Sequence, residues 1–473
     1  MSPMLHAHNG SGKTVQLGQA RENMVMQIFE YSLAWQSIWT SCRTTERGYS
    51  AVSDAERGTA RRSPWLRAAA MLAAFLVLPM FSTVDGPTAR AETGLTLPTD
   101  DPFYRAPDRL ADAAPGTVLR TRTTAIGMVG ARLPMEATQV LYRTTGERGE
   151  PTATVTTIIR PPSNSGPLRI MSYQSAYDAL GAKCDPSYTL RGGGGTSTLM
   201  DAPIYAAYLA AGFTVVSTDY EGLDLAYGAG HKSGYATLDG IRAALTALGA
   251  PSSTPVGMSG FSGGSIATEF AAELAPAYSP ELNIVGAALG GYPVDLTNVV
   301  SYVDGTQEWA SLLPYVFQGA ARGFGIDVTP YLSDYGKQLF AQVADECVPP
   351  TGPAFPGLRM QQLLRPEYPD YRTIPALAPM IEQTRMGRSG TPKTPLYLGG
   401  GNVDGIGDGV MVAGDERALA ADYCRRGVAV RYTEYSGANH LAAGVMFVPA
   451  AMAFLQARFD GAQFDNGCAE LTR

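Results

Sequence analysis

Charged side chains and histidines are both scarce in this sequence. Only 17% of its 473 residues are Asp, Glu, Lys or Arg, against 45% hydrophobic residues, and there are 4 histidines. Disordered chains usually have the opposite balance, so the sequence indicates a globular protein that is long enough to bury a large core. No CxxC pair and no cluster of Cys and His residues is present, so neither a metal site nor a cofactor is expected.

An excess of basic charge is also lacking. Of 36 Lys and Arg and 43 Asp and Glu residues, 9 and 6 respectively fall within residues 1–91, which leaves 27 basic and 37 acidic residues in the rest. A chain with this negative balance is poorly suited to bind nucleic acids or anionic membranes. We therefore expect no nucleic-acid partner.

The apolar run at residues 68–81 is short for a membrane span, which needs ~20 residues. Arginines precede it, and Ala89-Arg90-Ala91 follows it. This layout is typical of a secretory signal peptide, so residues 1–91 are predicted to be an N-terminal extension and signal, and no stable membrane span is expected once they are removed. A membrane anchor or a buried helix is the alternative. A translation start after Met1, or an extended n-region, would explain the residues in front of the run.

Four cysteines follow residue 91, namely Cys184, Cys347, Cys424 and Cys468. An even number of cysteines in an exported chain favours disulfide bonds, and three pairings are possible. The expected location is secreted, outside the cell.

Strand-like and helix-like patterns alternate through most of the remaining chain. Residues 92–123 read as an extended arm. Strands are predicted at residues 137–143, 153–159, 169–174, 214–218, 256–258, 396–398 and 428–435, and helices at 203–212, 236–248, 265–274, 411–424 and 449–459. This alternation predicts an α/β fold with a largely parallel central sheet flanked by helices.

The alternation stops between about residues 295 and 390. Aromatic helical patterns fall at residues 309–322 and 331–343, and a proline-rich stretch follows. We therefore predict a core in two parts, residues 92–294 and 391–473, interrupted by a mainly helical cap or lid at 295–390. Such an insertion sits over the carboxyl ends of the strands, where α/β sheets bind ligands.

Gly260-Phe261-Ser262-Gly263-Gly264 matches the pattern G-x-S-x-G. In α/β hydrolases the serine of this pattern lies on a strained turn between a strand and a helix, which requires small neighbours. The predicted strand before it and helix after it supply that context, and the helix N-terminus favours developing negative charge. Ser262 is therefore the candidate nucleophile of a serine ester hydrolase. Ser259 is a competing serine but lacks the G-x-S-x-G pattern of flanking glycines.

His440 is the candidate base for Ser262. His6 and His8 precede the expected signal, and His231 lies in a Gly-rich loop upstream of the serine. Because the triad of α/β hydrolases runs Ser, acid, His along the chain, only His440 has the right order. The acid that orients it should follow the strand at 396–398, where Asp404 and Asp408 compete. Spacing from the strand favours Asp404, and proximity to the next helix favours Asp408.

Further segments accompany the serine motif in a fixed order. They are Asp101-Pro102-Phe103-Tyr104, Ala114-Pro115-Gly116-Thr117-Val118-Leu119, Ser172-Tyr173-Gln174, Tyr177-Asp178, Cys184-Asp185-Pro186-Ser187-Tyr188, Thr218-Asp219-Tyr220-Glu221-Gly222, Leu238-Asp239-Gly240-Ile241-Arg242-Ala243-Ala244, Gly290-Gly291-Tyr292-Pro293, Tyr423-Cys424-Arg425-Arg426-Gly427 and Arg458-Phe459-Asp460-Gly461. In these segments the sequence resembles the secretory triacylglycerol lipases of fungi and actinobacteria, of the lipase A type.

The resemblance implies the α/β-hydrolase fold and the triad Ser262, Asp408 and His440. It also implies an oxyanion hole formed by the backbone N–H of Gly263 and by Asp178, whose carboxyl must be protonated to donate a hydrogen bond. Residues 295–390 would then form an acyl-binding cap. Two pairings of cysteines are implied, Cys184 with Cys347 and Cys424 with Cys468. Gly263 stands where the family often has Gln or His.

Hydrolysis of acylglycerols or related lipid esters is the expected function, with a lipid or ester small molecule as partner, acting at a lipid–water interface. Two alternatives stay open from the residues alone. One is a carboxylesterase for short, soluble esters, and the other is a non-catalytic binding protein of hydrolase fold.

Overall fold

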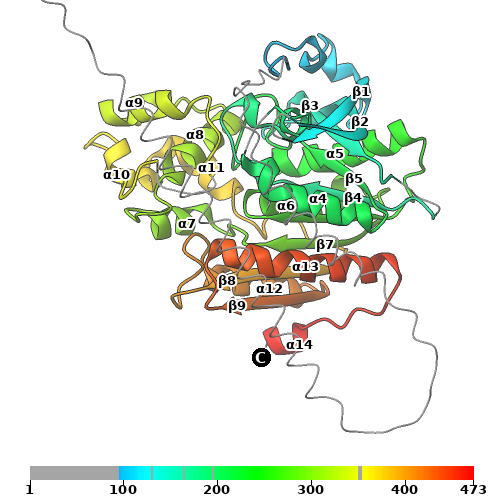
Figure 1. Cartoon of the computed structure of the whole chain (residues 1–473). Helices are drawn as coiled ribbons and strands as arrows, with labels where there is room; N and C mark the ends of the chain where they lie inside the picture. The colour runs from blue at the N-terminus through cyan, green and yellow to red at the C-terminus, as the bar shows by residue number, and fades with distance from the viewer. Residues whose placement is uncertain (1–94, 129–130, 163–165, 194–195, 350–353, 473) are drawn as a thin grey trace, which may run out of the picture. The chain divides into compact units, whose positions relative to one another are not determined.

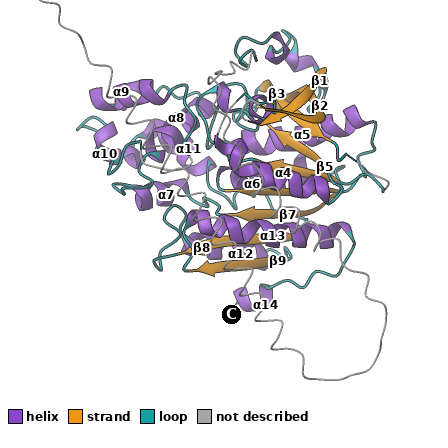
Figure 2. Cartoon of the chain, in the orientation of Figure 1, coloured by secondary structure: helices purple, strands orange, loops and turns teal. Residues whose placement is uncertain are grey.

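The computed structural model describes residues 95–128, 131–162, 166–193, 196–349 and 354–472. Within them lies one sheet in the order β1-β2-β3-β5-β4-β6-β7-β8-β9 (Figures 1 and 2). Its strands are β1 (Val118–Met128), β2 (Ala131–Thr145), β3 (Pro151–Ile159), β4 (Ile170–Gln174), β5 (Thr214–Thr218), β6 (Val256–Phe261), β7 (Ile284–Gly290), β8 (Leu396–Asn402) and β9 (Val430–Ser436).

The sheet is antiparallel at one end and parallel over the rest. β1, β2, β3 and β5 pair antiparallel, whereas β5, β4, β6, β7, β8 and β9 all run parallel. Parallel strands need crossover connections, and the helices between them supply these. The predicted α/β-hydrolase fold, with a largely parallel sheet flanked by helices, is confirmed.

Alternate residues of the strands pack against helices on opposite faces. Val215 belongs to one hydrophobic cluster and its neighbour Val216 to another, as the period of two in a strand requires. One face packs against α4 (Thr196–Ala210) and α13 (His440–Phe459), and the other against α5 (Gly230–Leu248), α6 (Gly263–Tyr278) and α12 (Ala413–Arg425). The strands from β4 to β8 are therefore buried on both faces, which explains their largely apolar sequences.

A set of short helices connects β7 to β8. They are α7 (Leu296–Val303), α8 (Leu312–Phe324), α9 (Asp334–Val343), α10 (Met360–Leu363) and α11 (Ala378–Gln383), with turns of 3-10 helix at η4 (Thr329–Tyr331), η5 (Tyr371–Thr373) and η6 (Pro375–Leu377). They enclose a hydrophobic cluster of their own that includes Phe317, Leu339 and Leu363. In Figure 2 they gather on the side toward which the arrowheads of β8 and β9 point.

Three expectations about local structure were wrong. The predicted arm at residues 92–123 contains η1 (Pro102–Tyr104), η2 (Leu110–Asp112) and the start of β1. The final long helix begins at His440 rather than at residue 449, because Asn439 caps it by accepting the N–H of Ala442, and Pro449 is accommodated inside the helix. His231 lies in the first turn of α5, not in a loop.

α13 is, within the described ranges, the one helix long and apolar enough to cross a membrane. It packs against β6, β7 and β8, which is the position of a core helix. The predicted signal peptide lies outside the described residues.

Candidate active site

Ser262 lies on the turn between β6 and α6. Its backbone has φ 55° and ψ −127°, a conformation that non-glycine residues rarely adopt. The flanking glycines allow the turn to pack closely. A Cβ on Gly260 would lie 2.2 Å from the carbonyl oxygen of Gly264, and a Cβ on Gly264 would lie 2.1 Å from that of Gln174. The G-x-S-x-G pattern is thus required by backbone contacts on both sides of the serine.

His440 joins Ser262 to Asp408. Its Nε2 lies 2.8 Å from Ser262 Oγ, and its Nδ1 lies 2.7 Å from Asp408 Oδ2. The N–H of His440 also donates to the carbonyl oxygen of Asp408 at 2.8 Å. Asp408 is fully buried, and its Oδ1 accepts the N–H groups of Val410 and Met411. This arrangement fixes the carboxylate, which in turn orients the imidazole toward the serine.

Asp404 plays a different structural role, which sequence spacing alone did not reveal. Its Oδ1 accepts the N–H groups of Ile406 and Gly407, and its Oδ2 accepts the hydroxyl of Tyr302 at 2.8 Å. These hydrogen bonds, the one from Gly407 first, hold the pKa of Asp404 below its usual value. Asp404 therefore orders the exposed part of the loop, and Asp408 is the aspartate that contacts the histidine.

Aromatic side chains enclose His440. The ring of Phe261 lies 5.0 Å from the imidazole, and Trp309 meets it edge-on at 5.5 Å. Gly291 lies beneath it, since a Cβ there would fall 2.9 Å from His440 Cε1. The role of Trp309 was missed in the sequence, although it is one of only 4 tryptophans. Its contact shows that the segment between β7 and β8 reaches the candidate site.

Asp178 lies beside the N-terminus of α6. A Cβ on Gly263 would be 1.6 Å from Asp178 Oδ1, and this buried oxygen has no hydrogen-bond partner among the described residues. Burial raises the pKa of the Asp178 carboxyl to about 7, against the opposing effect of a hydrogen bond with Tyr227. The N–H of Gly263, the first residue of α6, has no acceptor within the helix. Two potential donors, a protonated carboxyl and a backbone N–H, therefore lie close together.

His231 forms a second serine–histidine–carboxylate chain, away from Ser262. Its Nδ1 lies 3.0 Å from Glu147 Oε1, and its Nε2 lies 3.0 Å from Ser389 Oγ. Ser389 follows no strand–helix turn, and its own N–H already donates to Glu273. We interpret this chain as a structural link between α5 and the loop before β8. No group of three or more metal-ligating side chains occurs in the part of the chain that is described.

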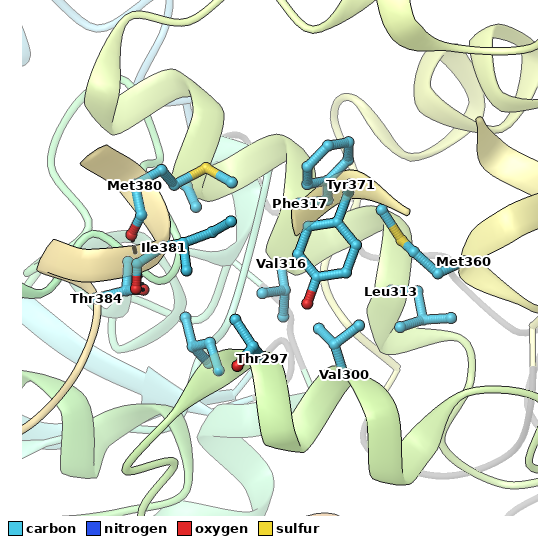
Figure 3. A pocket seen from close by; sticks show the side chains of 12 residues that line it. Thr297, Val300, Leu313, Val316, Phe317, Met360, Tyr371, Met380, Ile381 and Thr384 are labelled. Atoms are coloured by element: carbon cyan, nitrogen blue, oxygen red, sulfur yellow. Dashed lines mark hydrogen bonds between the residues drawn. The ribbon is translucent and has the colours of Figure 1, made fainter. Parts of the chain in front are cut away.

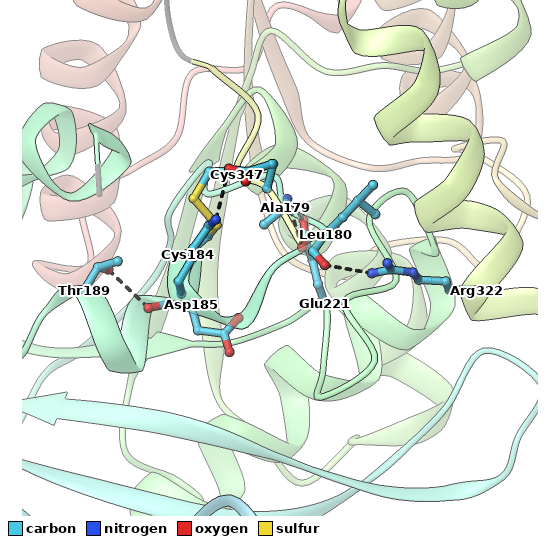
Figure 4. Close-up of a disulfide and its surroundings, with 10 residues drawn as sticks. Ala179, Leu180, Cys184, Asp185, Thr189, Glu221, Arg322 and Cys347 are labelled. Carbon is cyan, nitrogen blue, oxygen red and sulfur yellow. Dashed lines mark hydrogen bonds and ion pairs between the residues drawn. A yellow bond between two sulfur atoms is a disulfide. The ribbon is translucent and has the colours of Figure 1, made fainter. Parts of the chain in front are cut away.

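Both cysteine pairings expected from the resemblance are confirmed. Cys184 is bonded to Cys347 with a Cα–Cα distance of 5.7 Å, and Cys424 to Cys468 with 5.4 Å. The first bond connects the loop that follows Asp178 to the segment after α9 (Figure 4). The second ties the end of α12 to α14 (Cys468–Leu471).

The sheet order, the parallel strands and the serine turn define the class of the molecule as an α/β hydrolase. The chain belongs to the secretory lipase family, whose model matches residues 192–467. Family membership supports a hydrolase that acts on lipid esters, and an extracellular location fits both the family and the disulfide bonds.

Relatives cover most of the chain. Lipase A of Arthroderma benhamiae is 33% identical over 79% of this chain and 82% of that protein. A Mycobacterium tuberculosis protein named a probable inactive lipase is 35% identical over 77% and 83%. Among solved structures, Candida antarctica lipase A in its closed state superposes with a TM-score of 0.72 at 29% identity, covering 78% of this chain and 88% of that one.

Proposed function

We propose that the protein is a secreted lipase that hydrolyses acylglycerols or related lipid esters through Ser262, His440 and Asp408. The observation that carries this proposal is the continuous hydrogen-bond chain from Ser262 Oγ through both nitrogens of His440 to Asp408, at 2.8 and 2.7 Å. A serine hydroxyl is a weak nucleophile until such a base is in contact with it.

In the first half of the reaction, His440 Nε2 takes the proton of Ser262 while Oγ attacks the ester carbonyl carbon. The resulting oxyanion accepts hydrogen bonds from the N–H of Gly263 and from protonated Asp178. The C–O bond to the alcohol then breaks, and His440 returns the proton to the leaving alcohol. Asp408 stabilises the imidazolium throughout.

In the second half, water replaces the alcohol. His440 takes a proton from the water, whose oxygen attacks the acyl-enzyme carbonyl carbon. Collapse of this second intermediate releases the fatty acid and returns the proton to Ser262 Oγ. No cofactor enters either half.

We also propose that residues 295–390 form a cap that receives the acyl chain. An apolar cavity of about 30 Å³ lies among its helices, and Figure 3 shows the side chains around it. Val300, Leu313, Val316, Phe317, Met360 and Met380 are among its lining residues. The cavity is too narrow for a long acyl chain in this conformation. Methionine side chains adapt easily, so Met360 and Met380 are suited to move aside when a chain enters.

A non-catalytic role is the second candidate, because one relative is named a probable inactive lipase. Activity is favoured here by the contact between Ser262 and His440, which a binding protein does not need. Short-chain carboxylesterase activity is the third candidate, since the triad chemistry is the same.

One set of assays separates these candidates. The purified protein is given p-nitrophenyl butyrate, p-nitrophenyl palmitate and an emulsified triacylglycerol. We expect turnover of the long-chain ester and of the emulsion. Turnover of the butyrate alone would identify a carboxylesterase, and a folded protein without turnover of any ester would support the non-catalytic role.

Secretion is supported by the family and by the two disulfide bonds. N-terminal sequencing of protein recovered from the culture medium is expected to begin after Ala91. A mature form that retains residues before Arg61 would contradict the proposed signal peptide.

A further inference from the structure

The backbone around Asp178 is strained and is held from outside its own loop. Asp178 has φ 33°, in the left-handed region that non-glycine residues rarely occupy. Its carbonyl oxygen accepts the N–H of Val348 at 2.9 Å. Such a conformation persists only when surrounding contacts enforce it. The position of the Asp178 carboxyl therefore depends on the segment that carries Val348.

That segment pairs with the loop over three consecutive residues. Ala179 faces Cys347 in an antiparallel bridge, and the N–H of Leu180 donates to the carbonyl oxygen of Glu346 at 2.9 Å. The approach is close, because a Cβ on Gly181 would lie 2.4 Å from the carbonyl oxygen of Asp345. Residues 346–348 follow α9 and belong to the proposed cap.

Arg322 of α8 binds both the loop that follows Asp178 and the segment that follows α9. Its Nη1 donates to the carbonyl oxygen of Leu180 at 2.9 Å, and its Nη2 donates to that of Ala344 at 2.7 Å. Figure 4 shows the guanidinium beside Leu180, with Ala179 and Leu180 between it and the disulfide of Cys184 and Cys347. A planar guanidinium with several fixed donors is suited to join two carbonyl groups in one geometry.

The core contacts the same loop through Glu221. Glu221, in the loop after β5, is buried, and its two carboxyl oxygens lie 3.3 and 3.2 Å from the N–H of Ala179. The loop is therefore held by one contact from the core and by a set of contacts from the segment between β7 and β8. Only the second set involves Arg322 and the disulfide.

We propose that Arg322 and residues 344–348 form a clamp through which the cap positions Asp178 for oxyanion stabilisation. Arg322 is a positioning residue in this arrangement, because it acts through Leu180 and touches no reacting atom. The clamp rests on the proposed function, since it presupposes that Asp178 donates to the oxyanion. Through this clamp the cap would hold an oxyanion donor in place, in addition to receiving the acyl chain.

The test compares Arg322→Met with Arg322→Lys. Methionine keeps much of the apolar stem and loses both donors, whereas lysine can bind one carbonyl. Because small misplacements of catalytic groups cost up to about 100-fold, we expect Arg322→Met to lower kcat about 10- to 100-fold, with little change in KM. Arg322→Lys should recover part of the loss. Arg365→Met is the matched control, because Arg365 bonds the carbonyl oxygen of Pro330 within the same segment, away from Asp178.

A trifluoromethyl ketone inhibitor reports the oxyanion hole directly, since its adduct with Ser262 carries the oxyanion. Its inhibition constant in Arg322→Met should rise by the same factor as kcat/KM falls. Titration with an alkyl phosphonate, which labels Ser262, counts the active sites in each preparation. Each kinetic value is then expressed per active site, so that unfolded protein does not contribute. Unchanged ketone affinity per titrated site would overturn the clamp, and so would an equal loss in Arg365→Met.

A second variant covers the case in which Arg322→Met does not fold. The double substitution Cys184→Ala and Cys347→Ala keeps the guanidinium but frees the segment, and it should lower kcat and ketone affinity together. Normal ketone affinity there would also overturn the clamp. If the unsubstituted, folded protein were inactive and were not labelled by the phosphonate, the proposed function itself would be refuted. Failure of the clamp and failure of the proposed function are therefore distinguishable.

Discussion

At the scale of single residues, the site depends on backbone conformations that contacts between backbone segments enforce. Ser262 and Asp178 both have positive φ, at 55° and 33°. Each such residue costs about 1–3 kcal/mol, so neighbouring contacts must compensate. For Ser262 the compensation comes from close glycine contacts at positions 260 and 264. The sequence revealed this through its motif, whereas the strain at Asp178 has no local sequence signal.

Asp408 and Asp404 should differ sharply when each is changed to asparagine. Asp408→Asn removes the carboxylate that holds His440, so we expect kcat to fall about 10⁴-fold with the fold intact. Asp404→Asn should act through the order of its loop and cost about 1 kcal/mol of stability. Kinetics and thermal unfolding of both variants provide the measurement. A crippled Asp404→Asn beside a nearly normal Asp408→Asn would contradict the assignment.

The carboxyl of Asp178 should impose a pH limit on activity. Burial raises its pKa to about 7, and only the protonated form donates a hydrogen bond. We therefore expect the contribution of Asp178 to kcat/KM to be lost as the pH rises through about 7. Protonation of this carboxyl also contributes to the stability of the folded state, with the same dependence on pH. That contribution is complete below the unfolded pKa of about 3.9 and declines as the pH rises toward 7.

Two substitutions at this position test the limit. Asp178→Asn should abolish the alkaline decline, because an amide donates without titrating. Asp178→Leu has no donor and should lower kcat about 10²- to 10³-fold at every pH. An unaltered pH profile of kcat/KM in Asp178→Asn would show that another group sets the limit.

At the scale of secondary-structure elements, the sequence patterns predicted which segments are helical better than they predicted where each helix begins and ends. The pattern placed the last long helix at residues 449–459, because proline favours helix starts. The structure starts α13 at His440, which puts the histidine at the helix N-terminus opposite Ser262. An asparagine cap followed by an apolar sequence was the signal available at Asn439.

The disulfide between Cys424 and Cys468 should affect stability alone. It joins α12 to α14 across 44 residues, and neither element carries Ser262, His440, Asp408 or Asp178. Its removal by Cys424→Ser with Cys468→Ser should lower the free energy of unfolding by about 3–4 kcal/mol. kcat should remain unchanged, in contrast to the pair that includes Cys184. Denaturant unfolding and kinetics of both double variants decide this, and a loss of kcat here would contradict the division of roles.

The cap helices should determine the preference for acyl length. Ala320 lies on α8, is buried, and lines the cavity. Ala320→Leu adds bulk to that space, so kcat/KM for long-chain esters should fall about 10-fold relative to butyrate. Esters of graded length provide the measurement, with thermal unfolding as the control for overpacking. An equal loss for short and long esters would place the acyl chain elsewhere.

At the scale of the whole molecule, local patterns predicted the α/β architecture, and contacts between distant segments escaped them. The strands from β4 to β8 had clear apolar signals because they are buried on both faces. The contact of Trp309 with His440 joins residues 131 positions apart, so no local pattern could indicate it. The sequence also left Asp404 and Asp408 as alternatives, because both follow the same strand and only the folded loop separates their roles.

Family membership does not by itself settle activity, because one relative carries a name that includes the word inactive. The central claim is therefore the role of Ser262 in this chain. It is tested most directly by the kcat of Ser262→Ala on a long-chain ester, with Ser259→Ala, in the preceding strand β6, as the matched control. We predict that Ser262→Ala folds and loses about 10⁶ in kcat, while Ser259→Ala retains turnover. A Ser262→Ala protein that kept more than about one hundredth of the native kcat would contradict the assignment, since loss of the nucleophile leaves far less.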